Sequence, residues 1–396
     1  MAESIRDRVA IVGMGCTKFG ELWDKSPSDL VVEAAYEAFE DAGIQPNDVQ
    51  ACWLGTVADT TSGMAGLGIS APLRLQYKPV TRVENMCATG SDALRNASYA
   101  VAARVCDIAL VVGVEKMKDT GQAGLAVTGG LPSANVAPNA TAPGMFAMMA
   151  TKYFARYGLS PNDGKTMLAK IVVKNHHNGS LNPKAHFQRE ITLEQVLNAP
   201  IIAWPLGLFD CCGVSDGAAA AIVVPADQAR KFNLDPVFIK ALQICVGPAD
   251  GTVRSDYDYT HIEETYRAGL AAFAEAGIKN PRHEISMAEV HDCFSITEAT
   301  IMEDLQFSPR GKVREDVNAE AFALRGEIPI NPDGGLKCFG HPVGASGLRM
   351  MYEIYKQLQG KAGPRQIKNP QLGLTHNMGG QPPACTVSCI IAGLKA

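Results

Sequence analysis

An internal repeat is the feature that most constrains how this chain can fold. Residues 272–278 (AFAEAGI) match residues 38–44 (AFEDAGI), and residues 344–349 (GASGLR) match residues 90–95 (GSDALR). The first pair ends an amphipathic helix and precedes a strand, whereas the second pair opens a helix after a glycine-rich turn. Two matches in the same order predict two copies of one α/β unit. The offsets of 234 and 254 residues differ, so the copies differ by an insertion.

The first copy alternates strands and helices. An apolar strand at 9–15 precedes a helix that begins with the capping sequence Ser-Pro-Ser-Asp at 26–29 and ends at Gly43. A second strand is predicted at 51–57, and the run 108–114 is apolar throughout, as in strands buried on both faces of a parallel sheet. This order predicts a doubly wound α/β fold, which binds ligands at the carboxyl ends of its strands.

A segment of different composition interrupts the first copy. It starts with a stretch rich in Gly, Ala, Pro and Asn, and helices are predicted at 145–157 and 165–177. Buried-strand patterning then returns. We therefore expect an N-terminal half formed by residues 1–120 and 205–235, an inserted loop domain at 121–204, and a C-terminal half at 236–396.

The inserted segment carries a local excess of positive charge. From Lys165 to Arg189 the chain has five Lys and Arg residues and no Asp or Glu. In a chain of net charge −5 this excess is a candidate contact for a polyanionic ligand, and a solvated helix face explains it equally well.

Composition argues against several classes of function. A net charge of −5 gives no overall basic surface for nucleic acid, and no apolar run approaches the ~18 residues of a membrane-spanning helix. We expect neither a signal peptide nor a peroxisomal address at the two ends. Eleven cysteines without a paired framework or a Cys-x-x-Cys pair predict reduced thiols, no metal site and a cytoplasmic protein.

Cys87 lies on the turn between an extended run and an Ala-rich helix that we predict to reach Arg104. Unpaired backbone N–H groups at a helix start favour negative charge, so a thiol held there is expected to ionise more easily and act as a nucleophile. A buried cysteine that only packs in the turn is the competing explanation, and the turn alone favours it.

Three predicted strand ends of the second copy carry reactive or permissive residues. They are His291 with Cys293, His341 within the glycine-rich stretch 331–344, and Gly379 with Gly380. Each has a structural explanation on its own, such as a helix cap, a turn or tight packing. Because the loops of a duplicated α/β fold converge, their combination with Cys87 favours a catalytic site.

The chain resembles the thiolases, and within them the sterol-carrier-protein-type branch. The resemblance covers nearly the whole chain and is carried by residues 85–87 (Asn-Met-Cys), 115–117 (Glu-Lys-Met), 211–217, 291–294 (His-Asp-Cys-Phe), 331–342 with its Gly-His-Pro, 376–380, 174–176 and 182–183. It implies the thiolase fold, in which two duplicated α/β halves form a five-layered α-β-α-β-α core with an inserted loop domain. It also implies an acyltransferase that cleaves a 3-oxoacyl-CoA with coenzyme A (CoA), or runs the reverse Claisen condensation, without a permanently bound cofactor.

The resemblance also implies roles for individual residues. Cys87 would take the acyl group, His341 would accept its proton, and His341 with His291 would stabilise the enolate of an acyl-CoA. Backbone N–H groups of Cys87 and Gly380 would hold the oxyanion of the acyl-Cys intermediate. Contacts with CoA or the acyl chain are expected from Met145, Lys165, Lys174, His176 and Gly379.

The position of the second thiol is a departure from many thiolases. Those enzymes carry a second catalytic Cys in the final glycine loop, where this chain has Asn-Met-Gly-Gly at 377–380. In the sterol-carrier-type branch the thiol belongs to the His-Asp-Cys-Phe motif, here Cys293. A thiol suits acid/base work because its reference pKa lies near that of the CoA thiol. Cys338, the rival of Cys293, is assigned to packing, and His376 is assigned a structural role.

Alternative functions follow from the same motifs. A decarboxylating ketoacyl synthase shares the fold and the nucleophile but needs no second thiol, so Cys293 argues against it. A catalytically silent subunit is disfavoured because both cysteines and both histidines are intact. Some relatives work with a small zinc-containing subunit that carries an oligonucleotide-binding (OB) fold, so a two-protein complex acting on a bulky or aromatic 3-oxoacyl-CoA is a further alternative. Related retro-aldolases are expected to lack the two cysteines, and a homodimer or higher oligomer is expected.

Overall fold

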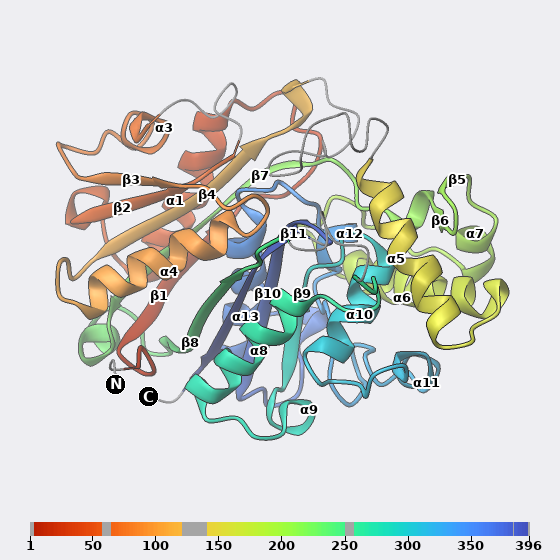
Figure 1. The fold of residues 1–396 in the computed structure, drawn as a ribbon. Helices are drawn as coiled ribbons and strands as arrows, with labels where there is room; N and C mark the ends of the chain where they lie inside the picture. The colour runs from red at the N-terminus through yellow and green to blue at the C-terminus, as the bar shows by residue number, and fades with distance from the viewer. Residues whose placement is uncertain (1–3, 58–64, 121–140, 250–256, 383, 395–396) are drawn as a thin grey trace.

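The computed structural model describes residues 4–57, 65–120, 141–249, 257–382 and 384–394. Within them, nine strands form one sheet in the order β3-β2-β4-β7-β1-β8-β11-β10-β9 (Figure 1). The strands of the first half are β3 (Val80–Val83), β2 (Ala51–Gly55), β4 (Ala109–Lys116), β7 (Asp216–Pro225) and β1 (Val9–Cys16). Those of the second half are β8 (Val237–Val246), β11 (Ala384–Gly393), β10 (Leu372–Gln381) and β9 (Met287–Val290).

The strand order confirms the predicted duplication. From β1 outward the first half runs β7, β4, β2, β3, and from β8 outward the second half runs β11, β10, β9. In the second half, a parallel bridge joins Ala288 of β9 to Ile330. This bridge corresponds to the parallel pairing of β2 with β3 in the first half. The halves meet where β1 and β8 pair antiparallel, so two equivalent sheets join edge to edge. Each half is mixed rather than wholly parallel, since β4 runs parallel to β2 and antiparallel to β7.

Helices complete the five layers that the resemblance implied. Helix α1 (Pro27–Ala42) packs with Ala10 and Val12 of β1, whereas the alternate residues Val9 and Ile11 pack with the layer of α4 (Thr89–Ala102) and α13 (Ser346–Leu358). Helices α4 and α13 contact each other and strands of both halves, so they form the central layer. Helix α8 (Glu263–Ala276) covers β8 and β11.

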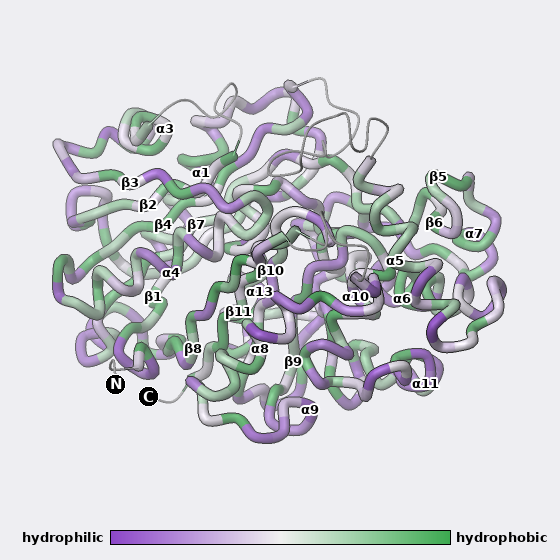
Figure 2. Tube along the Cα trace, in the orientation of Figure 1, coloured by the Kyte–Doolittle hydropathy of each residue, from purple (hydrophilic) through white to green (hydrophobic). Residues whose placement is uncertain are grey.

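Burial explains why these elements form where they do. The strands β1, β4 and β7 are buried along their whole length, and Figure 2 shows the sheet as largely hydrophobic with polar residues gathered in the outer loops. Helix α1 lies so close to β1 that a Cβ on Gly15 would lie 2.0 Å from the carbonyl oxygen of Ala34. Only glycine permits this approach of helix to strand.

The inserted segment forms helices beside the sheet layers. They are α5 (Ala142–Arg156), α6 (Pro161–Ser180) and α7 (Leu193–Leu197), with a two-stranded sheet of β5 (Ile201–Ala203) and β6 (Leu206–Gly207). Helices α5 and α6 begin three and four residues earlier than predicted because the side chains of Thr141 and Ser160 cap them. Strand β6 lies beyond residue 204, the expected end of the inserted domain, but pairs with β5 inside it. The three domain boundaries remain our proposal.

Short helices connect the remaining strands. They are α3 (Leu67–Ser70), α9 (Pro281–Glu284), α10 (Ser295–Asp304), α11 (Val313–Asn318) and α12 (Gly335–Cys338). No helix in the described ranges is long and apolar enough to cross a membrane.

Candidate active site

Cys87 lies in a constrained turn between β3 and α4. The preceding residue, Met86, has a φ of 49°, in the left-handed region that side chains rarely adopt. Thr89 fixes the turn: its hydroxyl accepts from the Asn85 N–H at 2.8 Å and donates to the Met86 carbonyl at 2.5 Å. The turn therefore holds the Cys87 sulfur beside the first residues of α4.

The glycine pair at the end of β10 lies directly against this turn. A Cβ on Gly379 would lie 2.6 Å from the carbonyl oxygen of Asn85 and 3.1 Å from the nitrogen of Cys87. Gly380 has a φ of +82°, and its N–H, together with the N–H of Cys87 itself, acts to lower the pKa of the Cys87 thiol. These are the two backbone donors that the sequence predicted for an oxyanion.

The surroundings of Cys87 contradict the expectation that this thiol ionises easily. Burial raises the pKa of Cys87 to about 12, and the nearby carboxylate of Glu115 raises it further. The two backbone N–H groups favour the thiolate but offset only part of these effects. These surroundings therefore favour the neutral thiol of Cys87 at neutral pH.

His341 presents an unprotonated nitrogen. Its Nδ1 atom lies 2.7 Å from the hydroxyl oxygen of Ser346, whose proton is donated to the Pro342 carbonyl at 2.8 Å. The imidazole proton is therefore assigned to Nδ1. Nε2 is buried and has no hydrogen-bond partner among the described residues. Burial and then Arg349 lower the pKa of His341 to about 3, so this nitrogen is a free acceptor at neutral pH.

His291 is held in the opposite tautomer. Its Nδ1 atom lies 3.4 Å from the backbone nitrogen of Met378 and 3.3 Å from the side-chain nitrogen of Asn377, both of which are donors. The proton is therefore assigned to Nε2, which can donate to a developing negative charge. The rings of His291 and His341 are perpendicular with centroids 5.2 Å apart. Burial and then His341 lower the pKa of His291 well below its usual value, so it too is neutral.

Cys293 follows β9 and belongs to a group of thiols. Its sulfur lies 3.9 Å from the Thr297 hydroxyl. Burial raises the pKa of Cys293 well above the usual value, and the neighbouring thiols of Cys212 and Cys87 raise it further. Cys212 is tied to the same loop, since its N–H donates to the Cys293 carbonyl at 2.8 Å. The loop of Cys293 reaches the turn of Cys87 by way of β10, because the nitrogen of Met378 lies 3.4 Å from His291 Nδ1 and Gly379 lies against Cys87. Cys338 is fully buried on α12, as expected for packing.

The two halves are joined at this site by Glu115. Its buried carboxylate accepts from the Thr56 hydroxyl at 3.1 Å, from the Val57 N–H at 3.0 Å and from the Gly344 N–H at 3.0 Å. Gly344 follows the Gly-His-Pro motif, and its carbonyl oxygen would lie only 2.8 Å from a Cβ on Gly90 in α4. The loop of His341 is thus fixed against the helix that follows Cys87.

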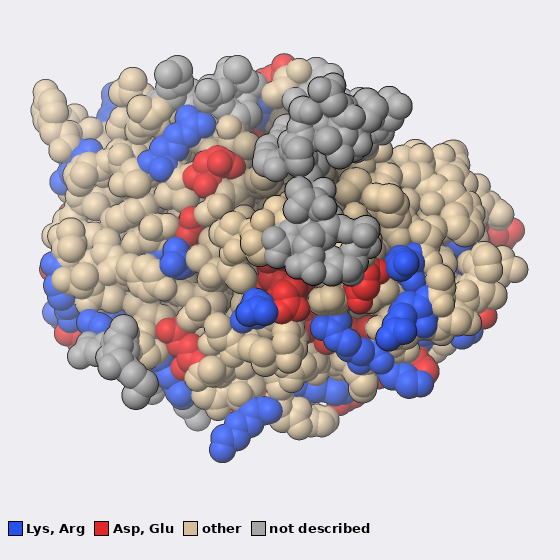
Figure 3. All heavy atoms as spheres, viewed as in Figure 1, with Lys and Arg blue, Asp and Glu red and all other residues tan. Residues whose placement is uncertain are grey.

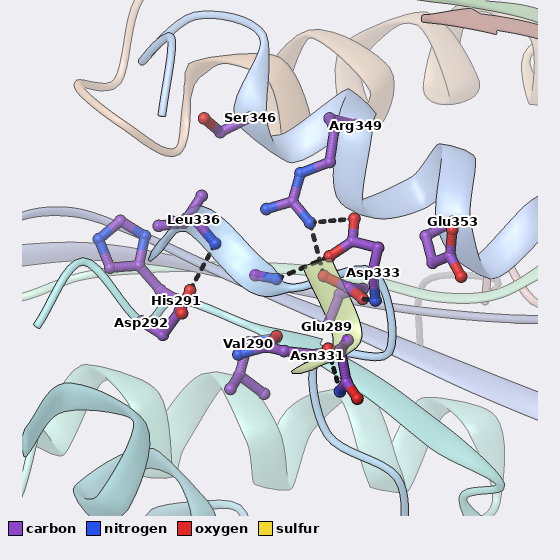
Figure 4. A network of polar contacts seen from close by, with 12 residues as sticks. Glu289, Val290, His291, Asp292, Asn331, Asp333, Leu336, Ser346, Arg349 and Glu353 are labelled. Carbon is purple, nitrogen blue, oxygen red and sulfur yellow. Dashed lines mark hydrogen bonds and ion pairs between the residues drawn. The ribbon is translucent and has the colours of Figure 1, made fainter. Parts of the chain in front are cut away.

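A buried polar network supports the loop of His291 (Figure 4). Arg349 bridges Glu289 and Asp333, with both distances 2.6 Å. The carboxylate of Asp292 accepts from the N–H of Leu336 at 2.6 Å and points away from the His291 ring. These contacts fix the loop that carries His291, and the charge of Arg349 contributes to the lowered pKa values of His341 and His291.

Three residues of this site were not assigned a role from the sequence. They are Ser346, Glu115 and Cys212. Ser346 lies in the repeated Gly-Ala-Ser-Gly segment and Glu115 in the Glu-Lys-Met triplet, so both stood in marked motifs without an assigned role. Cys212 stood in the marked stretch 211–217. His376, assigned a structural role, bonds the Thr265 hydroxyl at 2.9 Å.

The predicted CoA contacts differ in their surroundings. Lys174 pairs with the buried Glu298 at 2.6 Å and donates to the Ile330 carbonyl at 2.7 Å, so its ammonium group already has partners within the protein, and its contact with CoA stays a prediction. Lys165 is partly exposed on α6. Met145 is partly exposed in the first turn of α5, next to Phe146, which stacks on Phe294 with ring centroids 4.5 Å apart.

His176 lines a cavity of about 520 Å³ on the inserted segment. Arg189, Phe187 and Phe209 also line it, and His176 Nδ1 lies 3.0 Å from the Arg189 carbonyl oxygen. A Cβ on Gly213 would lie 2.7 Å from the Phe187 ring, so the cavity wall touches the residue that follows Cys212. Figure 3 shows Lys and Arg side chains gathered over the nearby region of α6, α10 and α11.

No group of three or more His, Cys, Asp or Glu side chains in the described part of the chain is arranged to hold a metal ion. Two thiols, two neutral imidazoles and backbone N–H groups come from neighbouring loops of the two halves, and these groups are suited to nucleophilic and acid/base chemistry.

Two family models match the chain. They are "Thiolase, N-terminal domain" over residues 9–227 and "Thiolase C-terminal domain-like" over residues 249–391. Acetyl-CoA acetyltransferase of Methanothermobacter thermautotrophicus is 40% identical over 384 residues, which cover 94% of this chain and 96% of that protein. Sterol carrier protein 2 of Gallus gallus is 32% identical over 96% of this chain and 71% of that protein.

A solved structure matches the whole chain. The structure named "Ltp2-ChsH2(DUF35) aldolase" has a TM-score of 0.84 and 26% sequence identity, and the match covers 99% of this chain and 99% of that chain. The similarity in sequence and in structure therefore extends over both halves and the inserted segment.

Proposed function

The chain belongs to the thiolase family, and on this premise we propose how its residues divide the work of a CoA-dependent acyltransferase. The activity is that of a thiolase, as the family and the acetyl-CoA acetyltransferase relatives support. The observation that carries the residue roles is the buried Nε2 atom of His341, which has no hydrogen-bond partner among the described residues and is therefore available as a base.

In our proposal, Cys87 attacks the 3-keto carbon of a 3-oxoacyl-CoA while His341 Nε2 takes the thiol proton. Because burial and Glu115 disfavour a free thiolate, the proton leaves as the sulfur–carbon bond forms. The tetrahedral oxyanion is held by the N–H groups of Cys87 and Gly380. These donors are already in place, so no reorganisation is needed when charge develops.

Cleavage of the carbon–carbon bond leaves the acyl group on Cys87 and releases the enolate of an acyl-CoA. The Nε2–H groups of His291 and of the now protonated His341 hold the enolate oxygen. Cys293 donates its proton to the enolate carbon and becomes a thiolate. It then takes the proton of the incoming CoA thiol, whose sulfur attacks the acyl group, and Cys87 regains its proton from His341.

We propose that the nucleotide end of CoA occupies the cavity lined by His176, Arg189, Phe187 and Phe209. Aromatic faces and a guanidinium suit an adenine with phosphates. Gly379, Met145 and Lys165 remain candidate contacts along the way to Cys87. CoA acts as a substrate, and no permanent cofactor is needed for these steps.

The assembly and location of the enzyme are also proposals. Strand β3 is the edge strand of the sheet that the described residues form, and an edge strand supports a homodimer formed there. Eleven free cysteines support a cytoplasmic enzyme. The structure named "Ltp2-ChsH2(DUF35) aldolase" joins two components, so a small OB-type subunit and a bulky or aromatic substrate form the second candidate. The presence of Cys87 and Cys293 favours thiolase over aldolase chemistry.

The test is a panel of acetoacetyl-, medium-chain and aryl-substituted 3-oxoacyl-CoAs, assayed for CoA-dependent cleavage with and without a candidate small subunit. We expect cleavage of at least one thioester by the chain alone, with an acyl group found on Cys87. The proposal would be contradicted if the chain cleaved none of these thioesters under either condition and Cys87 carried no acyl group.

A further inference from the structure

A second cavity, of about 530 Å³, lies between α6 and the segment that follows α11. Its apolar lining includes Ile171, Leu181, Leu193, Val317, Phe322 and Leu324. This volume falls within the range of small-molecule sites, ~300–1,000 Å³, and the lining has the predominantly apolar character of such sites.

The charges around the cavity amount to one excess positive charge. Lys170, Lys174 and Arg325 line it, against the carboxylates of Glu298 and Glu320. Lys174 is neutralised by Glu298 at 2.6 Å. A single excess charge on an apolar cavity matches a monoanion better than a polyanion such as CoA.

Two of these cations are bound only by neutral groups. Lys170 Nζ donates to the side-chain oxygen of Asn318 at 2.7 Å, and Arg325 donates to the carbonyl oxygens of Gln366 at 2.5 Å and Pro364 at 3.3 Å. No carboxylate pairs with either cation among the described residues. Both can therefore turn toward an anionic group without breaking an ion pair.

The cavity is separate from the acyl-transfer centre. On α10, Thr297 faces the Cys293 sulfur at 3.9 Å, whereas the next residue, Glu298, borders the cavity. The amides of Asn175 and Asn331 bind the other oxygen of Glu298 at 2.6 and 2.9 Å and close the space behind it. A molecule in this cavity would therefore contact neither thiol.

We propose that this cavity is a second ligand site that binds a medium-chain monocarboxylate, with the carboxylate held by Lys170 and Arg325 and the apolar chain lying against α6, Leu193 and Phe322. The site is distinct from the CoA cavity, whose lining shares none of these residues. The carboxylate matches Lys170 and Arg325, which pair with no carboxylate among the described residues, and the apolar chain matches the apolar walls.

The test is calorimetric titration of the full chain with decanoate, with and without saturating CoA. We expect one site per chain whose affinity CoA leaves unchanged. Replacing both cations in Lys170→Gln/Arg325→Gln should weaken decanoate binding about tenfold or more. The same change should leave binding of 1-decanol, the uncharged analogue, unaltered.

Two further variants sharpen the result. Ala323→Trp fills the cavity from its lining and should abolish binding of both probes. Lys231→Gln removes an exposed charge outside the cavity and should change neither. The proposal is overturned if decanoate does not bind, if CoA displaces it, or if the folded double variant binds decanoate as the parent chain does.

Discussion

The Nδ1 atom of His341 lies 2.7 Å from the hydroxyl oxygen of Ser346. Since Ser346 gives its own proton to the Pro342 carbonyl, it can only accept from the imidazole. In the mechanism we propose, this contact decides which nitrogen of His341 can take a proton from Cys87. Ser346 would then act on the reaction through the tautomer of His341 rather than through contact with substrate.

Ser346→Ala should therefore reduce kcat/KM by about tenfold or more, because His341 is no longer held with its proton on Nδ1. The melting temperature should change little beyond the loss of one buried hydrogen bond. Steady-state thiolysis beside thermal unfolding checks both. The matched control is Ser98→Ala, which removes a buried hydroxyl of α4 that has no described partner and should leave kcat/KM unaltered.

Cys87→Ala should abolish acyl transfer while CoA still binds. The sulfur is the only group proposed to bond the acyl carbon, whereas CoA contacts lie elsewhere. Mass spectrometry after incubation with acetyl-CoA should show no acyl adduct, and calorimetry should show CoA binding within about threefold of the parent. Retained thiolysis by this variant would remove Cys87 from the mechanism.

Glu115→Gln should make Cys87 more reactive toward alkylation. The carboxylate of Glu115 is the largest charge that raises the pKa of Cys87, and glutamine keeps an oxygen for the Val57 and Gly344 N–H groups. We expect iodoacetamide to label the Cys87 peptide severalfold faster at pH 8 than in the parent. Glu84 raises the same pKa by less, so Glu84→Gln should accelerate labelling less; the reverse order would contradict this account.

Buried neutral histidines should make stability fall in acid. Burial lowers the pKa of His376 to about 3, so between pH 6.5 and 3 the unfolded chain binds a proton that the folded chain does not. This contribution to stability is present above pH 6.5 and is lost as the pH falls toward 3. His376→Gln should flatten the pH dependence of the unfolding free energy by up to about 1.4 kcal/mol per pH unit, measured by urea titrations between pH 4 and 6. An unchanged slope would show that His376 is protonated in the folded chain.

The fold was largely predictable because its signals are local and occur twice. The repeated Ala-Phe-Glu/Ala segment and the two glycine-rich helix starts predicted the duplication, and the strand order confirms it. Glycines, helix caps and apolar runs determine structure within a few residues of their own position, so they can be recognised in a single sequence. The mixed direction of the strands had no such local signal.

The site was only partly predictable because its contacts join distant residues. The Glu115–Gly344 hydrogen bond spans 229 positions, and the partner of Lys174 is Glu298, on another helix. No local pattern marks either pair. The turn at Cys87 predicted an easily ionised thiol, but the pKa follows from burial, which depends on the whole fold. The roles of Cys87, His291, Cys293 and His341 remain predictions, of which the variants above test that of Cys87 directly and that of His341 through Ser346.

The central claim is that two thiols share the reaction, Cys87 as the acyl carrier and Cys293 as the acid and base. Its most direct test is Cys293→Ala, in which intact-mass spectrometry after addition of acetyl-CoA is combined with the rate of acetoacetyl-CoA cleavage. The account predicts that Cys87 is still acetylated while carbon–carbon bond cleavage falls by about 10²–10⁴-fold, the contribution expected of one acid/base group. Full turnover by Cys293→Ala, or loss of the acetyl adduct together with turnover, would contradict it.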